Sequence, residues 1–331
     1  MLRTEFISTG MYVPDRVVKN DEFTQWMDTS DEWIRTRTGI TERRWVAEGQ
    51  TGADMACEAA KLALSRADLK ASDLDCIIYC TLSPDHFFPG TGVFLQRQLG
   101  VSDIPCLDVR NQCTGFLYGL SIADGWIRSG QYRRVLLVGS EVHSTGMDLT
   151  TRGRDLAVLF GDGAGVAILG PTEADGRGVL STHLFADGRH AEVLFCDAPA
   201  SARHPRLGQE DLDTARIFPV MNGKEVFKHA STRMPESVKL ALDANGLAAQ
   251  DIKVLIPHQA NLRISEMVRR QLDLREEQVF NNIMRYGNTT AGSIPIALDE
   301  CVQAGLLDRG DLLVLAAFGS GFTWGSAAIR W

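Results

Sequence analysis

The sequence predicts an α/β protein made of two similar halves, each with a mostly parallel sheet covered by helices on both faces. Two observations predict this fold. First, the segments Lys61–Cys80 and Lys239–His258 align without a gap and share eight identical residues among twenty positions. Second, short continuous apolar runs alternate with helical patterns along the chain, which is typical of strands that are buried on both faces of a parallel sheet.

Each copy of the repeat predicts the same three elements in order. A helix ends in Leu-Ala-Leu, a polar turn with an aspartate follows, and a short apolar strand completes the unit. Further along, a turn, a helix of about 14 residues, a glycine stop and a buried strand follow both Gly115 and Gly292. Chance similarity between helix–turn–strand units is the alternative, but the constant offset of 178 residues (239 − 61) disfavours it. The sequence therefore predicts an internal duplication.

The composition is that of an ordinary globular chain. Its 331 residues are 44% hydrophobic and 23% charged, which suffices for one large core or two fused halves. A net charge of −8 argues against general affinity for nucleic acid. No apolar run reaches the roughly 18 residues of a membrane span, and the chain starts without the apolar stretch of a signal peptide. We expect a cytoplasmic protein without a membrane anchor.

The seven cysteines are odd in number and widely scattered. They show no pair of CxxC motifs, and a chain of this size needs no disulfide framework, so most are expected to be small buried hydrophobes. We expect no metal and no resident cofactor.

The duplication also predicts where the reactive residues lie. We expect a first half at about 1–172 and a second at 173–331, with an inserted segment at about 184–220. In α/β sheets, ligands gather at the carboxyl ends of the strands and the amino ends of the following helices. Three chemically interesting residues occupy matched places of this kind, although they are far apart in sequence: Cys113, His258 and Asn288. A pseudo-twofold axis between the halves would bring them together.

Cys113 is the predicted nucleophile. It stands in Asn111-Gln-Cys-Thr-Gly, where a strand gives way to an amphipathic helix. The unpaired N–H groups and the positive dipole end of that helix favour the thiolate form. The alternative is a buried structural cysteine, and position alone does not decide between the two.

His258 and Asn288 are the predicted partners of this thiol. His258 closes an apolar strand and Asn288 lies in a glycine-bounded turn; singly, they would be read as a satisfied core histidine and a capping asparagine. Jointly, a His N–H and an Asn amide form a pair of neutral donors that can hold a thioester oxygen while it gains negative charge. Cysteine, histidine and asparagine together therefore favour acyl transfer followed by decarboxylative carbon–carbon bond formation.

Two glycine-rich segments have different predicted uses. Phe318-Gly-Ser-Gly-Phe-Thr-Trp-Gly-Ser lies between two strands and can bring a backbone N–H close to a bound oxygen. Phe160-Gly-Asp-Gly-Ala-Gly lacks the lysine and hydroxyl residue of a P-loop and the dinucleotide pattern, so a tight structural turn is the preferred interpretation.

These residues, with several further motifs, resemble β-ketoacyl-acyl carrier protein synthase III, the condensing enzyme that initiates type II fatty acid synthesis. The resemblance covers nearly the whole chain. It is carried by Ser30-Asp-Glu-Trp-Ile-Arg-Thr-Arg-Thr-Gly-Ile, Cys113-Thr-Gly-Phe, Phe160-Gly-Asp-Gly-Ala-Gly, Met221-Asn-Gly-Lys-Glu-Val-Phe, His258-Gln-Ala-Asn, Tyr286-Gly-Asn-Thr-Thr and Thr323-Trp-Gly-Ser.

The resemblance implies a homodimer with the thiolase fold, in which two duplicated βαβαβαββ halves stack in five layers (αβαβα). It implies that Cys113 takes the acyl group from coenzyme A, and that His258 and Asn288 promote decarboxylation of malonyl-acyl carrier protein to give 3-oxoacyl-acyl carrier protein. The backbone N–H groups of Cys113 and Ser320 would form the oxyanion hole. Family members usually have glycine at position 320, and a backbone donor tolerates serine there if its φ and ψ do.

The resemblance also implies a site for coenzyme A and its pantetheine arm, formed by Trp33, Arg37, Arg152, Gly223 and Asn261. Trp33 would stack on adenine, with Arg37 and Arg152 near phosphates. Without the resemblance, a solvated face would be the default for the arginine cluster made of Arg35, Arg37, Arg43 and Arg44.

Other positions bear on the substrate and on the second subunit. The resemblance implies that Phe88 crosses a dimer interface to close the partner's acyl pocket. Segment 184–220 looks longer than in the standard initiating enzymes, and Asn111-Gln112 replaces a usual small residue. These departures keep an alternative open, a specialised condensing enzyme or acyltransferase of secondary metabolism with a different acyl donor or acceptor. A non-catalytic dimer partner is a third reading, which the presence of all three reactive residues disfavours.

Overall fold

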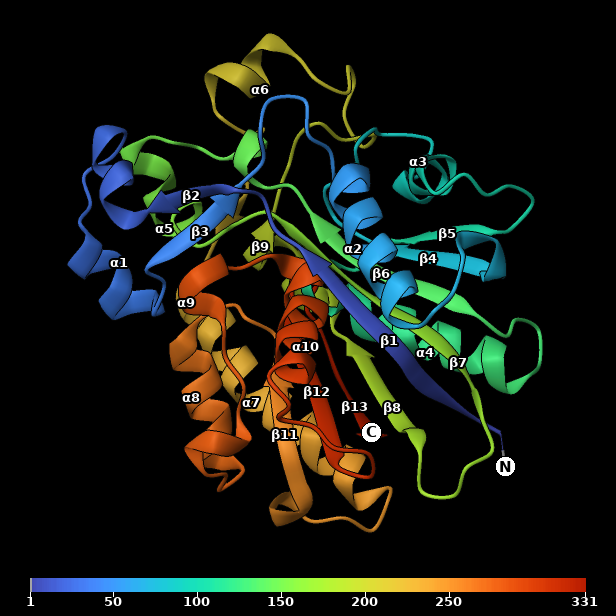
Figure 1. Cartoon of the computed structure of the whole chain (residues 1–331). Helices are drawn as coiled ribbons and strands as arrows, with labels where there is room; N and C mark the ends of the chain where they lie inside the picture. The colour runs from blue at the N-terminus through green and yellow to red at the C-terminus, as the bar shows by residue number, and fades with distance from the viewer. Residues whose placement is uncertain (1) are drawn as a thin grey trace.

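The computed structural model describes residues 2–331, which form two main β-sheets (Figure 1). The first has the strand order β1 (Arg3–Tyr12), β7 (Gly163–Thr172), β6 (Val135–Glu141), β4 (Cys76–Cys80) and β5 (Cys106–Val109). The second has the order β11 (Ile252–Pro257), β12 (Leu312–Gly319), β13 (Thr323–Arg330) and β8 (Gly178–Ala186). In sequence order, β7 is the last strand of the first sheet and ends at Thr172, and the next strand, β8, belongs to the second sheet.

The two sheets share one pattern of strand directions. In the first, β4 and β6 are parallel, and β7 and β1 continue antiparallel. In the second, β11 and β12 are parallel, and β13 and β8 continue antiparallel. Strand β5 pairs parallel to β4, and its counterpart in the second sheet is a single parallel bridge between Leu255 and Val279. The repeat seen in the sequence thus corresponds to β4 in one half and β11 in the other.

Helices fill the space between the sheets and cover their outer faces. The central layer is α4 (Gly115–Arg128) with α10 (Ser293–Gln303), whose side chains form one core with residues of both sheets. Helix α2 (Gly52–Arg66) packs on the other face of the first sheet, and α7 (Gly223–Asp243) and α8 (Leu262–Gln271) pack on the outer face of the second. The result is the predicted five-layered αβαβα arrangement.

The remaining elements are short. They comprise α1 (Asp31–Thr38), α3 (Thr91–Gln98), α5 (Arg154–Ala157), α6 (Gln209–Asp213), α9 (Ile283–Tyr286), and the strand pairs β2 (Arg16–Lys19) with β3 (Glu42–Trp45) and β9 (Leu194–Phe195) with β10 (Val220–Met221). The segment at 184–220 holds the end of β8, then β9, α6 and the start of β10; its greater length relative to the standard enzymes stays a prediction. Among residues 2–331, no helix is both long and apolar enough to cross a membrane.

The central helices end as the sequence predicts. Gly130 follows α4 with φ +76°, and Gly305 follows α10 with φ +67°. This left-handed conformation closes a helix at little steric cost only for glycine. The glycine stops therefore set matched ends for the two helices of the shared layer.

Arg43 departs from the expectation of a solvated arginine cluster. Its side chain is completely buried, and its guanidinium donates to Val18 O (3.2 Å), Asn20 Oδ1 (2.8 Å) and Val158 O (2.8 Å). The same group lies 4.7 Å from the ring centre of Phe23. Burial lowers the pKa of Arg43 to about 10, so it is still charged at neutral pH. Arg43 is thus a structural tie between β3, the N-terminal segment and the region of α5.

Replacing Arg43 by alanine is expected to destabilise the protein by about 3 kcal/mol or more, because three buried acceptors lose their donor. The matched control is Arg35→Ala, since the side chain of Arg35 is 58% exposed and its nearest carboxylate, on Asp31, is 3.7 Å away. That change should stay within about 0.5 kcal/mol. Urea unfolding of both variants provides the measurement, and equal stabilities would contradict the structural role of Arg43.

Candidate active site

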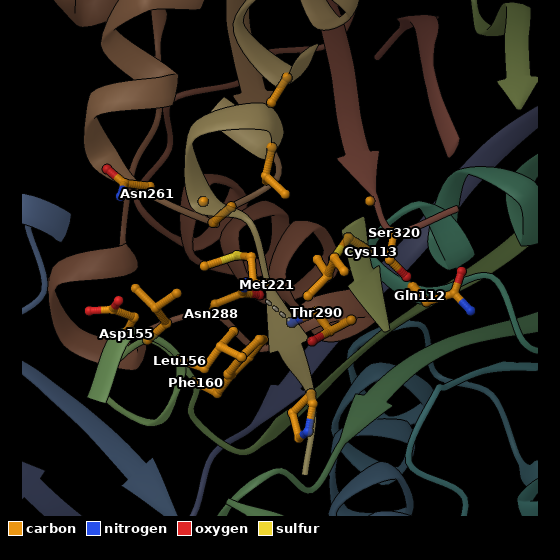
Figure 2. A pocket seen from close by; sticks show the side chains of 18 of the residues that line it. Gln112, Cys113, Asp155, Leu156, Phe160, Met221, Asn261, Asn288, Thr290 and Ser320 are labelled. Atoms are coloured by element: carbon orange, nitrogen blue, oxygen red, sulfur yellow. Dashed lines mark hydrogen bonds between the residues drawn. The ribbon is translucent and has the colours of Figure 1, made fainter. Parts of the chain in front are cut away.

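The three predicted reactive residues line one cavity. Cys113, His258 and Asn288 all contribute to its wall, and its volume is about 1500 Å³. Figure 2 shows Cys113 and Asn288 around this cavity, although they come from different halves of the chain. The matched strand ends predicted from the duplication therefore do converge.

Cys113 stands just before α4, in a short 3-10 turn that runs from Gln112 to Thr114. Gln112 has φ +46°, an uncommon conformation for a residue with a side chain, and it also lines the cavity. The expectation that this place favours the thiolate is not met. Burial raises the pKa of the Cys113 thiol to about 12, and the charge of Glu141 acts in the same direction. Burial is the largest cause of this shift, so the resting sulfur carries its proton.

The end of β12 lies directly against this cysteine. A Cβ atom on Gly319 would stand 3.0 Å from Cys113 Cβ and 3.1 Å from Cys113 N, so only glycine fits there without a shift. The next residue, Ser320, lines the cavity, and its φ lies outside the positive range. The backbone at position 320 therefore allows serine in place of the glycine that is usual in the family.

His258 follows β11 and presents one free ring nitrogen. Its Nδ1 lies 2.6 Å from Ser293 Oγ, whereas its Nε2 is buried and has no partner. Ser293 Oγ also accepts from Gln259 N (3.5 Å), and in the tautomer in which its hydroxyl donates to Nδ1, the ring hydrogen lies on Nε2. Burial lowers the pKa of His258 to about 3, so the ring is neutral. His258 is thus a neutral donor on the cavity wall.

Asn288 supplies the second neutral donor. Its Oδ1 accepts from Thr290 N at 2.8 Å, which leaves the amide NH₂ free (Figure 2). Its backbone is held by the first half, because Asn288 N donates to Leu159 O (2.8 Å) and Asn288 O accepts from Gly161 N (3.1 Å). The Phe160 motif is accordingly a structural turn that supports Asn288, as the sequence favours.

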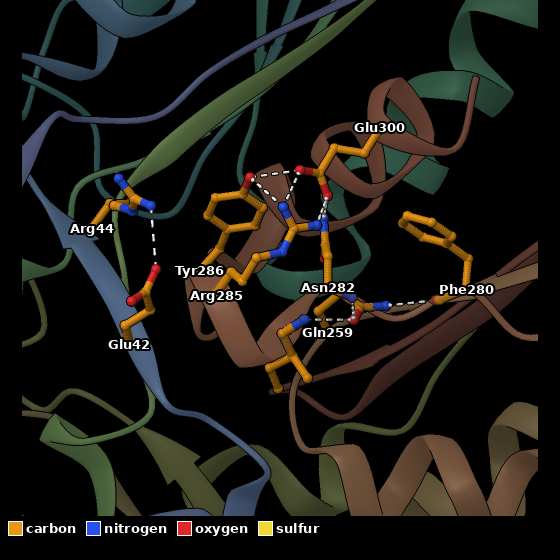
Figure 3. Close-up of polar contacts among 9 residues, drawn as sticks. Glu42, Arg44, Gln259, Phe280, Asn282, Arg285, Tyr286 and Glu300 are labelled. Carbon is orange, nitrogen blue, oxygen red and sulfur yellow. Dashed lines mark hydrogen bonds and ion pairs between the residues drawn. The ribbon is translucent and has the colours of Figure 1, made fainter. Parts of the chain in front are cut away.

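A polar network fixes the histidine and asparagine segments relative to each other (Figure 3). Gln259, the neighbour of His258, accepts from the backbone of Asn282 at 3.0 Å. Asn282 donates in turn to Glu300 of α10 (2.9 Å), which also accepts from Tyr286 Oη (2.6 Å). Because Tyr286 lies two residues before Asn288, this network ties the end of β11 to the turn that carries Asn288.

Four of the five residues predicted to hold coenzyme A line the same cavity: Trp33, Arg37, Gly223 and Asn261. Asn261 caps α8 by accepting from Arg263 N at 2.9 Å. Arg152 is absent from the lining; its Nε donates to Asp148 Oδ2 at 2.6 Å, and its side chain is 60% exposed.

Arg154 was not identified from the sequence. The guanidinium carbon of Arg154 lies 4.5 Å from the ring centre of Trp33, and that of Arg37 lies 4.4 Å from the same ring. Trp33 is therefore contacted by two arginines, of which Arg37 lines the cavity and Arg154 does not.

Phe88 lies outside this cavity. Its side chain is 79% exposed, next to Phe87 at 57%, on the loop between β4 and α3. Strand β5 forms the nearby edge of the first sheet. The chain thus presents an apolar loop beside an unpaired strand edge.

Two further residues at the end of β6 were also missed, Glu141 as the last residue of the strand and His143 two residues beyond it. His143 lines the cavity, and burial lowers its pKa to about 3. Glu141 is fully buried, and burial raises its pKa to about 7, although Thr81, Leu82 and Ser83 donate to it. The rule that singled out His258, a polar residue at the end of an apolar strand, applies equally to both.

A duplicated five-layered fold, with a thiol from one half facing two neutral donors from the other, defines a condensing acyltransferase of the thiolase fold. Family models described as 3-oxoacyl-[acyl-carrier-protein] synthase III and its C-terminal part match residues 107–188 and 242–331. The β-ketoacyl-[acyl-carrier-protein] synthase III of Alkalilimnicola ehrlichii is 45% identical over 100% of both chains, and that of Rhodospirillum centenum is 43% identical over 100% of this chain and 99% of its own.

Structural similarity agrees with these matches. The crystal structure of 3-oxoacyl-[acyl-carrier-protein] synthase III from Aquifex aeolicus superimposes with a TM-score of 0.91 at 40% identity, covering 99% of this chain and 100% of the other. The chain belongs to the β-ketoacyl-[acyl-carrier-protein] synthase III family.

Proposed function

We propose that this enzyme condenses an acyl-coenzyme A primer with malonyl-acyl carrier protein to give 3-oxoacyl-acyl carrier protein, as the initiating step of fatty acid synthesis. The observation that carries the proposal is the convergence of the Cys113 thiol with two unpaired neutral donors, on His258 and Asn288, in one cavity. The family relationship gives the substrate class.

The first step is acyl transfer to sulfur. Cys113 Sγ attacks the thioester carbonyl, and the backbone N–H groups of Cys113 and Ser320 donate to the oxygen that becomes negative. The intermediate collapses with loss of the coenzyme A thiolate. The proton that leaves Cys113 is balanced by the one that the departing thiolate takes up, so the step consumes no net acid or base.

The second step makes the carbon–carbon bond. His258 Nε2–H and the amide of Asn288 donate to the thioester oxygen of the malonyl group, so that its carboxylate leaves as CO₂ and the electron pair forms an enolate. The enolate carbon attacks the acyl carbonyl on Cys113. The sulfur leaves and takes up one proton, which restores the thiol.

The binding of the carrier groups follows from the cavity wall. Trp33, with Arg37 and Arg152, would contact the nucleotide of coenzyme A, whereas Gly223 and Asn261 would lie along the pantetheine arm. Arg154, which contacts the Trp33 ring, would support that tryptophan. No resident cofactor is needed for either step, because the thioesters supply all the bonding electrons. A cytoplasmic location stays a prediction.

The functional unit in this proposal is a homodimer. The exposed Phe87 and Phe88 beside the edge strand β5 are the features that a second copy would cover. Sedimentation velocity should give twice the chain mass at micromolar concentration. A monomer there would contradict the dimer and the role of Phe88 in the partner's acyl pocket.

The experiment that tests the function supplies malonyl-acyl carrier protein with and without an acyl-coenzyme A primer. We expect CO₂ release and 3-oxoacyl product only when the primer is present. Acyl transfer without CO₂ release would instead support the alternative of a specialised acyltransferase. A panel of primers and acceptors in the same assay would identify its donor.

Gly319→Ala is expected to slow condensation by about 10- to 100-fold, because its new methyl group must displace Cys113. The matched control is Gly125→Ala, since a Cβ there meets no atom within 4 Å. Initial rates of product formation provide the comparison. Wild-type activity in Gly319→Ala would show that the close approach of β12 to the nucleophile has no functional consequence.

A further inference from the structure

His143 makes a polar contact that joins the two halves at the active site. It follows β6 of the first half, and its Nε2 lies 2.5 Å from Thr290 Oγ1 of the second half. Thr290 in turn donates its backbone N–H to Asn288 Oδ1 at 2.8 Å, the bond drawn in Figure 2. A continuous chain of hydrogen bonds therefore runs from the His143 ring to the amide of Asn288.

Thr290 needs such support because its backbone is strained. Its φ is +49°, a conformation that a β-branched residue rarely adopts. Residues in this region persist where surrounding contacts hold them, and they gather at functional sites. Among residues 2–331, the Thr290 hydroxyl has one hydrogen-bond partner, which is His143.

His143 is itself firmly placed. Its ring lies against Phe160, with ring centres 4.5 Å apart, and its backbone N–H donates to Asp162 Oδ1 at 2.6 Å. Because the ring is neutral, it keeps both a donor and an acceptor nitrogen. It can therefore pair with the threonine hydroxyl without introducing a charge beside the thioester.

We propose that His143 is a positioning residue that, through Thr290, orients the Asn288 amide for the decarboxylation step. This inference rests on the proposed function, because it assigns Asn288 to the second step. In this role His143, although its ring lines the cavity, acts on Asn288 through Thr290. The first step, acylation of Cys113, does not use Asn288 and should be insensitive to this contact.

The test separates the two steps. Acylation is followed by intact mass after mixing with acyl-coenzyme A, and condensation is followed in a single turnover of the isolated acyl-enzyme with malonyl-acyl carrier protein. His143→Leu should acylate within about twofold of wild type but condense about 10- to 100-fold more slowly. Thr290→Val, which removes only the hydroxyl contact, should show the same split, and the double variant should lose little more.

Thr290→Ser is the conservative control, because serine keeps the hydroxyl, and it should condense at close to the wild-type rate. The inference is overturned if His143→Leu and Thr290→Val condense normally, or if acylation and condensation fall equally, as a purely structural role would require. If His143→Leu does not fold, Thr290→Val decides alone. Failure of the wild-type protein to acylate Cys113 would instead refute the proposed function itself.

Discussion

Replacing Cys113 by alanine is expected to remove the acyl adduct and to lower condensation by at least about 1000-fold. The reason is that the Cys113 sulfur accepts the acyl group, and alanine at this place in the cavity wall has no group that can form the thioester. Intact mass after incubation with acyl-coenzyme A measures the adduct, and product formation measures the second step.

Cys196→Ala is the matched control, because Cys196 is the other cysteine that lines the cavity. That variant should keep the adduct, and peptide mapping of the wild-type protein should place it on Cys113. Full condensation activity in Cys113→Ala would refute the mechanism. A missing adduct in the wild-type protein would revive the reading of a non-catalytic dimer partner.

Most of the fold was predictable because the two halves of the chain repeat the same sequence pattern. The repeat at Lys61 and Lys239 places β4 and β11 in matched positions, and the glycines at 130 and 305 end matched helices. Hydrophobic periodicity, the glycines that end helices and the internal repeat can all be read directly from the sequence. The same logic placed Cys113 and His258 on one cavity, since each residue follows a strand of the parallel part of its sheet.

Other features depend on packing that no local pattern encodes. Arg43 reads like its neighbours in sequence, yet it is buried, because its acceptors come from segments far along the chain. Arg152 is bonded to Asp148, which lines the cavity, but Arg152 itself is not a lining residue. The high pKa of the Cys113 thiol has the same origin, because burial is its largest cause.

His258→Ala and Asn288→Ala are expected to slow condensation by about 100- to 1000-fold while leaving acylation of Cys113 nearly intact. Each removes one of two neutral donors to the developing enolate, and loss of one such donor has an effect of this size. The double variant should be little worse than either single one, because the donors act as a unit. Single-turnover condensation of the acyl-enzyme provides the measurement, and His183→Ala, on β8 outside the cavity, is the control.

The same variants test how the buried thiol is activated. Because burial raises the pKa of the Cys113 thiol to about 12, the thiol must lose its proton as the new bond forms. The proton can pass to the departing coenzyme A thiolate, or a histidine can take it up as a general base. If the Ser293 hydroxyl donates to Nδ1, the ring hydrogen lies on Nε2, and the free nitrogen of the ring is then a donor and not a base. Ser293→Ala releases this restraint and should therefore weaken condensation more than acylation. Equal loss of both steps in His258→Ala would assign the proton transfer to His258 and would reverse the tautomer argued here.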